Sequence, residues 1–152
     1  MIPPPPPLRI EAVAADHLHD VWLFVRQGLI RIIAKVRPGW WTEDVFSAVR
    51  GGYAGLWMTY RGQRALGFFI GYPQVQPFTA KKEWLLWAAY TIPFRDRLPD
   101  DNVGEVVTLS MEFMNEEAKR QGCESLVMLS TRRGFERYGF KRGFTTWRRG
   151  LT

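Results

Sequence analysis

Residues 83–129 read EWLLWAAYTI (83–92), PFRDRLPDDN (93–102), VGEVVTLSMEFMNEEAKRQG (103–122) and CESLVML (123–129). The first stretch is dense in Trp, Leu, Ala and Tyr, which is typical of a central strand buried on both faces, although periodicity alone also permits a helix. Apolar residues at spacings of three and four predict a helix over residues 103–121, and Gly122 ends it. A short apolar strand follows at residues 125–129. A strand–helix–strand unit of this length is almost always right-handed, so its two strands should be parallel.

The segments before this unit predict a helical pair and an antiparallel meander. Alternation predicts a short strand at 8–13, and an apolar stripe predicts a helix over 17–36 with Asp16 as its N-cap. A second helix is predicted from Thr42 to Gly51, followed by strands at 53–60 and 65–72 around a short loop containing Gly62.

A brief helix at 131–137 and a final strand, or pair of strands, at 140–148 complete the expected order β-α-α-β-β-β-α-β-α-β. The expected fold class is α/β (α+β), with a mixed sheet and helices on both of its faces. In the helix of residues 103–121, Phe113 and Met114 lie on the apolar stripe, so we expect both to be largely buried.

Length and composition predict one folded domain. Of the 152 residues, 46% are hydrophobic and 14% aromatic, which excludes disorder for most of the chain. We expect a proline-rich tail over residues 1–7 and a single domain over residues 8–152. Cys123 is the only cysteine, which excludes a disulfide framework, and a structural zinc site is not expected. No apolar run approaches the ~20 residues of a membrane span, and no signal peptide is readable. The expected location is therefore the cytoplasm, or a particle assembled inside a cell.

Positive charge is concentrated at the end of the chain. The net charge is +6, and residues 131–152 contain seven Lys or Arg against Glu136, so the preceding residues balance to zero. A basic segment of this kind can meet phosphate on a nucleic acid or a cofactor, or simply be a solvated surface. Nucleic-acid binding is the minor alternative, because no recognised reading motif is present.

Residues 133–140, RGFERYGF, are similar to the Tyr-Glu-Arg-x-Gly-Phe stretch near the end of the GCN5-related N-acetyltransferases (GNAT family). Residues 122–129 also fit the glycine-then-strand pattern of that family. The order of elements resembles the family over nearly the whole chain, and residue-level similarity covers mainly 103–140. The Trp- and Arg-rich texture further resembles small phage-encoded proteins of this fold, some of which are components of the virion.

The resemblance implies an acetyl-CoA site between the strands of 83–92 and 125–129, and transfer of an acetyl group to an unidentified amine. It places the pantetheine arm on the backbone of Ala89, Tyr90 and Ile92. It places the pyrophosphate at the start of the next helix, on Val103, Gly104 and Glu105, where free N–H groups and the positive helix end favour an anion.

For catalysis, the resemblance implies a tyrosine that protonates the departing thiolate. The equivalent position here is Phe135, so Tyr138 is the predicted substitute. Glu83, which opens the strand of residues 83–92, is a candidate general base for the acceptor amine. The alternative for Glu83 is a solvent-exposed charge at a strand end.

The sequence also departs from the family at the phosphate-binding loop, which usually reads Arg/Gln-x-x-Gly-x-Gly/Ala. Counted back from Gly122, the last glycine is replaced by Val107, and Gly104 is out of register. Carboxylates also crowd this turn (Asp100, Asp101 and Glu105), so Arg95 and Arg97 would have to supply the positive charge. Two hypotheses therefore stay open. One is an acetyl-CoA-dependent N-acetyltransferase, and the other is a non-catalytic GNAT-like protein that binds protein partners, for example in a phage particle.

Overall fold

The computed structural model describes residues 2–128 and Phe140. Its strands form one sheet in the order β1-β2-β3-β4-β5, antiparallel up to β4 and parallel between β4 and β5. The strands are β1 Leu8–Ala12, β2 Gly55–Arg61, β3 Arg64–Val75, β4 Lys82–Thr91 and β5 Ser125–Met128. The predicted mixed α/β fold and the parallel pairing across the strand–helix–strand unit are confirmed.

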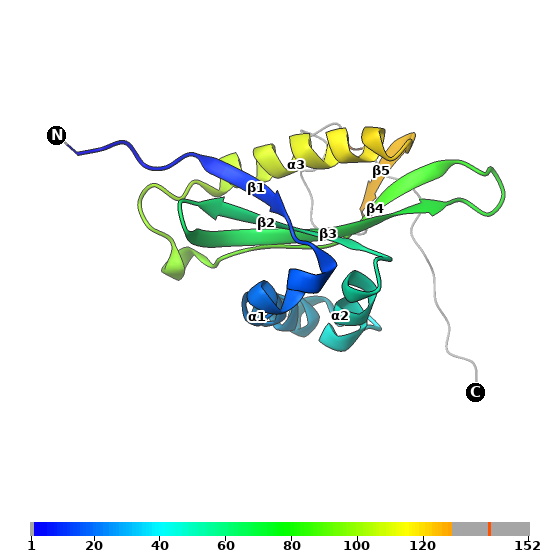
Figure 1. The fold of residues 1–152 in the computed structure, drawn as a ribbon, viewed down its shortest axis with the longest axis horizontal. Helices are drawn as coiled ribbons and strands as arrows, with labels where there is room; N and C mark the ends of the chain where they lie inside the picture. Colours follow the sequence, from blue (N-terminus) through cyan, green and yellow to red (C-terminus); the bar gives the residue numbers. More distant parts are fainter. Residues whose placement is uncertain (1, 129–139, 141–152) are drawn as a thin grey trace.

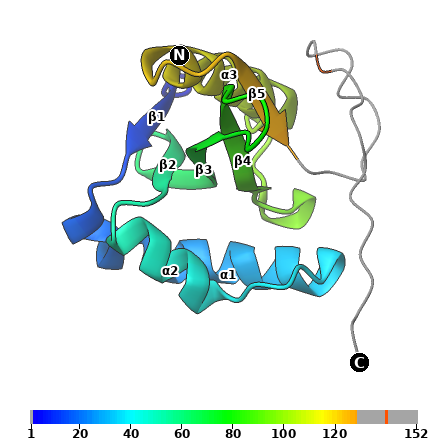
Figure 2. The same cartoon turned by 90° about the vertical axis from the view of Figure 1, so that its right-hand side faces the viewer.

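The helices cover both faces of this sheet, with α1 and α2 on one side and α3 on the other (Figures 1 and 2). They are α1 Leu18–Val36, α2 Thr42–Arg50 and α3 Val103–Arg120, with 3-10 turns at Ala15–His17 and Phe94–Asp96. None of the helices in the described part of the chain is both long and apolar enough for a membrane span.

Most predicted boundaries agree with the structure to within a few residues. The stretch of residues 83–92 is a strand, which removes the helical alternative. The predicted N-cap is wrong, because Asp16 lies inside a 3-10 turn and His17 occupies the cap position of α1. The helix predicted at 131–137 lies outside the described residues, as does the strand predicted at 140–148 except for Phe140, which is in no strand.

Two apolar layers hold the helices on the sheet. On one face, Leu18, Val25 and Leu29 of α1 pack with Val45 of α2 against the sheet. On the other, Met114 and Ala118 of α3 pack against Trp57, Phe69 and Trp84 of the sheet.

The prediction for the α3 stripe is half right. Met114 is only 2% exposed, whereas Phe113 is half-buried. Met114 and Ala118 are one helical turn apart and occupy the centre of the buried face. Phe113 is therefore turned to the flank, where its ring lies 6.3 Å from that of Trp57.

Candidate functional site

Within the described part of the chain, β5 pairs with only the first part of β4, and we call the remaining stretch, Trp87–Thr91, the free edge of β4. The parallel register runs from Glu83 opposite Ser125 to Leu86 opposite Met128. From Trp87 to Thr91, no described residue pairs with the β5-side edge of β4 (Figure 2). Ala89, within this stretch, is exposed, so the prediction of a strand buried on both faces does not hold at this residue. A strand edge with unpaired N–H and C=O groups can bind an extended ligand through its main chain.

A β-bulge lies where this free edge begins. Ile70 of β3 is opposite Ala88, but the next residue, Gly71, is opposite Leu86, so Trp87 is an extra residue in β4. As a result Trp87 and Ala88 both face the α1–α2 layer, whereas Leu86 faces α3. A bulge bends the strand and increases its local twist.

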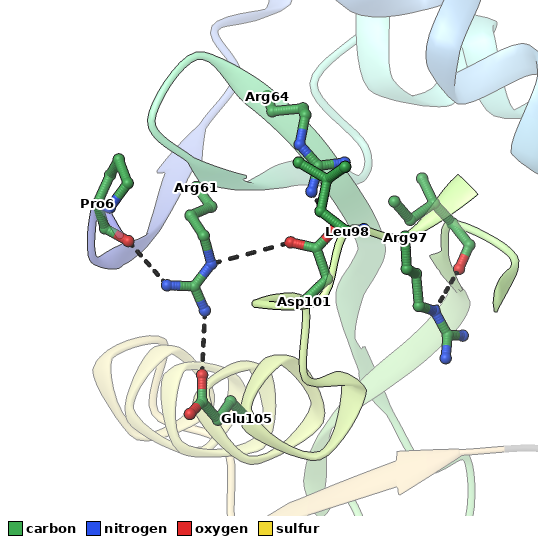
Figure 3. A network of polar contacts seen from close by, with 8 residues as sticks. Pro6, Arg61, Arg64, Arg97, Leu98, Asp101 and Glu105 are labelled. Carbon is green, nitrogen blue, oxygen red and sulfur yellow. Dashed lines mark hydrogen bonds and ion pairs between the residues drawn. The ribbon is translucent and has the colours of Figure 1, made fainter. Parts of the chain in front are cut away.

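The loop after β4 leads directly into the start of α3. The N–H of Ile92 donates to the carbonyl of Leu66 (2.9 Å), and the Ile92 carbonyl accepts from Nε of Arg97 (3.0 Å). Both main-chain groups of Ile92 are therefore engaged, and its N–H is not free for a ligand. Nε of Arg97 is fixed, while its terminal nitrogens extend beyond this bond at the carboxyl end of β4 (Figure 3).

The first turn of α3 has the features of an anion site. Oδ1 of Asn102 caps the helix by accepting from the N–H of Gly104 (2.9 Å). The first main-chain bond of the helix is that from Val106 N–H to the Asn102 carbonyl (3.2 Å), so the N–H groups of Val103 and Glu105 have no partner within the helix. They point outward at the positive end of the helix dipole.

Gly104 lies in this first turn, whereas Val107 lies in the second and is half-buried. A Cβ atom at Gly104 would meet only Oδ1 of Asn102, at 3.1 Å, so the backbone here is open to approach. Gly104 is therefore the glycine of the first turn, whereas Val107, which the residue count placed at the phosphate position, lies beyond that turn.

The carboxylates near this turn are bound by arginines of the β2–β3 hairpin (Figure 3). Asp101 pairs with Arg64 and lies 4.0 Å from Nε of Arg61, and Glu105 pairs with Arg61 at 3.0 Å. Burial alone would raise the pKa of Asp101. Hydrogen bonds from Arg64 and the Leu98 N–H, together with the charges of both arginines, outweigh burial and hold this pKa below its ordinary value. Much of the negative charge expected to oppose an anion is thus already compensated.

The predicted site residues divide into two groups. One group lies at the end of the sheet that carries the β2–β3 hairpin, and it contains Ala89, Tyr90 and the start of α3. Thr91 at the end of β4 pairs with Gly67, close to Arg64 of the hairpin, and Arg64 binds Asp101 just before α3. The ring of Tyr90 packs against Phe24 of α1 (6.1 Å between centroids), so only its backbone can serve the β4 edge.

Glu83 lies at the opposite end of β4, where β5 is paired. Its carboxylate accepts hydrogen bonds from Gln76 (2.5 Å) and Gln74 (3.4 Å). Tyr138 and Phe135 lie outside the described residues, so the catalytic assignment to Tyr138 stays a prediction.

A shallow hollow of about 670 Å³ lies on the other flank of α3, towards β1. Its lining joins the start of α3, at Asn102, Gly104 and Glu105, to Leu8 of β1 and Arg61 of β2. Arg61 is the only cation of this lining and is already paired with Glu105. The β1 side of the hollow therefore offers a phosphate no unpaired positive charge.

No protein-family model matches the sequence, and no curated protein matches it significantly. Solved structures do match. A probable acetyltransferase has a TM-score of 0.69 at 14% identity, over 95% of this chain and 98% of the other. A predicted acetyltransferase with acetyl-CoA from Clostridium acetobutylicum has a TM-score of 0.68 at 13% identity, over 95% and 96%.

A third match is a ribosomal-protein-alanine N-acetyltransferase from Brucella melitensis biovar Abortus 2308. Its TM-score is 0.66 at 13% identity, over 95% of this chain and all of the other. The chain has the fold of the GNAT acetyltransferases, as its order of elements had indicated.

Proposed function

We propose that this protein binds acetyl-CoA and transfers its acetyl group to an amine. The observation that carries the proposal is the edge of β4 after Leu86, with which no described residue pairs, and which leads through one loop to a capped helix start with outward N–H groups. The fold is that of acetyltransferases, one of which was solved with acetyl-CoA. Fold alone does not establish activity, so what matters is whether these residues can bind the pantetheine arm and the pyrophosphate of the coenzyme.

The pantetheine arm carries amide groups, which an unpaired strand edge can bind as it would another strand. Ala89 and Tyr90 are the backbone positions we assign to it, and the small, exposed side chain of Ala89 leaves room there. Ile92 is less suited than predicted, because its N–H is bound to Leu66.

The pyrophosphate would lie at the first turn of α3. The N–H groups of Val103 and Glu105 face outward there, and Gly104 allows close approach to the backbone. Arg97, anchored at the end of β4, would add positive charge through its terminal guanidinium nitrogens.

The chemistry is a direct acyl transfer. The amine nitrogen attacks the thioester carbonyl, a C–N bond forms, the C–S bond breaks, and coenzyme A leaves as a thiolate. The amine loses one proton and the thiolate gains one, so the reaction needs no other reactant. Tyr138 is the predicted donor to the thiolate, and Glu83 is the predicted acceptor of the amine proton.

Two measurements on the full-length protein test this proposal. Acetyl-CoA at 100 times its dissociation constant should stabilise the fold by about 2.7 kcal/mol. For a chain of this size that raises the melting temperature by roughly 5–10 °C. Release of free thiol in the presence of a panel of primary amines should then show turnover. No shift at millimolar acetyl-CoA would contradict the proposal.

Binding without turnover would instead support a non-catalytic coenzyme-binding protein. The phenylalanine at position 135, where the family has a tyrosine, favours this second hypothesis. Changing Phe135 to Tyr should then create measurable transfer, whereas an active wild-type protein would gain little from that change.

A further inference from the structure

The carboxylate of Asp101 is buried between two arginines of a neighbouring hairpin. Its side chain is only 4% exposed and that of Arg61 11% exposed. Oδ2 of Asp101 accepts from Arg64 and from the main-chain N–H of Leu98 (2.8 Å). A charged group this deeply buried persists only when it is paired and hydrogen-bonded, so these contacts fix its position.

Because Asp101 lies just before the start of α3, its pairing with the hairpin fixes where this helix begins. Asp101 immediately precedes the N-cap Asn102, and Glu105, in the first turn of α3, is bound to Arg61 of the same hairpin. Arg61 and Arg64 flank the two-residue turn between β2 and β3, where Gly62 has a φ of +61°. Next to the turn the two strands pair, with Arg61 opposite Arg64 and Tyr60 opposite Ala65, so the hairpin supports the start of the helix.

The two arginines hold Asp101 unequally. Arg64 makes a direct hydrogen bond, whereas Nε of Arg61 and Oδ1 of Asp101 face each other at 4.0 Å without one. The terminal nitrogens of Arg61 instead donate hydrogen bonds to the Pro6 carbonyl (2.7 Å) and to the carboxylate of Glu105 (Figure 3). Arg64 is therefore the principal partner of Asp101.

We propose that Asp101 is a positioning residue for coenzyme binding, which holds the loop before α3 against Arg64 so that the first turn of the helix faces the pyrophosphate. This inference rests on the proposed function. Asp101 itself does not touch the ligand. It acts by fixing the positions of the N–H groups of Val103 and Glu105 and of Arg97 in the same loop.

The test compares two ligands on the full-length protein by calorimetry. Acetyl-CoA carries the pyrophosphate, and S-acetylpantetheine has the same thioester and pantetheine arm without it. Asp101→Asn should weaken acetyl-CoA binding by about tenfold or more, the worth of a charge-assisted hydrogen bond. Binding of S-acetylpantetheine should change by less than about twofold, since a merely structural defect would weaken both ligands alike.

Two further variants keep the result interpretable. Arg64→Met removes the other partner and should reproduce the selective loss even if Asp101→Asn folds poorly. Glu117→Gln is the matched control, because Glu117 is also a buried carboxylate of α3, paired with Arg120 at the far end of the helix. It should leave both affinities unchanged.

Equal loss for the two ligands, or no loss of acetyl-CoA affinity in either Asp101→Asn or Arg64→Met, would overturn the role of Asp101 while leaving the proposed function standing. Wild-type protein that binds neither ligand would overturn the proposed function, and this inference with it.

Discussion

Gly28 of α1 lies directly against the ring of Tyr90 on β4. A Cβ atom built at Gly28 would be 2.7 Å from Cδ1 of Tyr90 and 2.6 Å from the ring of Phe68. The absence of a side chain thus lets α1 approach the sheet closely at the strand that forms the candidate site. It also explains why the Tyr90 side chain belongs to the core, leaving only its backbone for a ligand.

Changing Gly28 to Ala should therefore destabilise the protein although alanine favours helix. Overpacking of this kind typically costs about 1–3 kcal/mol, which exceeds the gain of about 1 kcal/mol in helix propensity. Urea unfolding measures the difference, with the exposed neighbour Gln27→Ala as control. Equal or greater stability of the Gly28 variant would show that α1 is not held this close to β4.

The second layer of the core gives a prediction about α3. Met114 is almost fully buried, so Met114→Ala should cost roughly 2–5 kcal/mol in unfolding free energy. Phe113 lies at the flank and is half-buried, so its replacement by Ala should cost less than that of Met114. The reverse order in denaturant unfolding would mean that the helix is rotated from the position described.

The elements of this fold follow from local patterns, whereas its site does not. The apolar stripe of α3 and the dense strand before it predict the parallel crossover, because both patterns are set by neighbouring residues. The bulge at Trp87 has no such signal, since the strand is apolar on both sides of it. The pairing of Asp101 with Arg64 joins residues 37 positions apart, and no periodicity in the sequence reports it.

The position of Gly104 at the start of α3 also could not be obtained by counting residues in the sequence. Counting back from Gly122 put Gly104 out of register, but the cap at Asn102 places it in the first turn. An Asn followed by two residues and a Glu was the available signal, because that spacing is typical of a helix start.

Acid should weaken the wild-type fold through Asp101. Its folded-state pKa lies below the unfolded value of about 3.9, so its contribution to stability is present above that pH. The contribution is lost as the pH falls through the folded-state value. Asp101→Asn should therefore be less stable at pH 7, and its stability should fall less than that of the wild type between about pH 5 and pH 3.

Urea unfolding at a series of pH values checks this difference, with the exposed neighbour Asp100→Asn as the matched control. Parallel pH curves for wild type and Asp101→Asn would show that the ion pair does not stabilise the folded state.

Gly104 gives a prediction about the ligand that should not affect the fold. Its Cβ position is open apart from Asn102, so Gly104→Ala should leave the melting temperature nearly unchanged. The added methyl group would stand where a phosphate approaches the backbone, so acetyl-CoA affinity should fall by about tenfold. Calorimetry measures this loss, with Gly39→Ala, which meets no neighbour, as control. Undiminished affinity would place the phosphate elsewhere.

The central claim is that the free edge of β4 and the start of α3 together form an acetyl-CoA site. Titration of isotopically labelled full-length protein with acetyl-CoA, followed by amide NMR shifts, tests it residue by residue. The account predicts saturable shifts concentrated at Trp87–Thr91 and at Val103–Glu105, with residues on the exposed side of α2 unaffected. No shifts at millimolar acetyl-CoA, or shifts confined to the hollow beside Leu8 and Thr108, would contradict it.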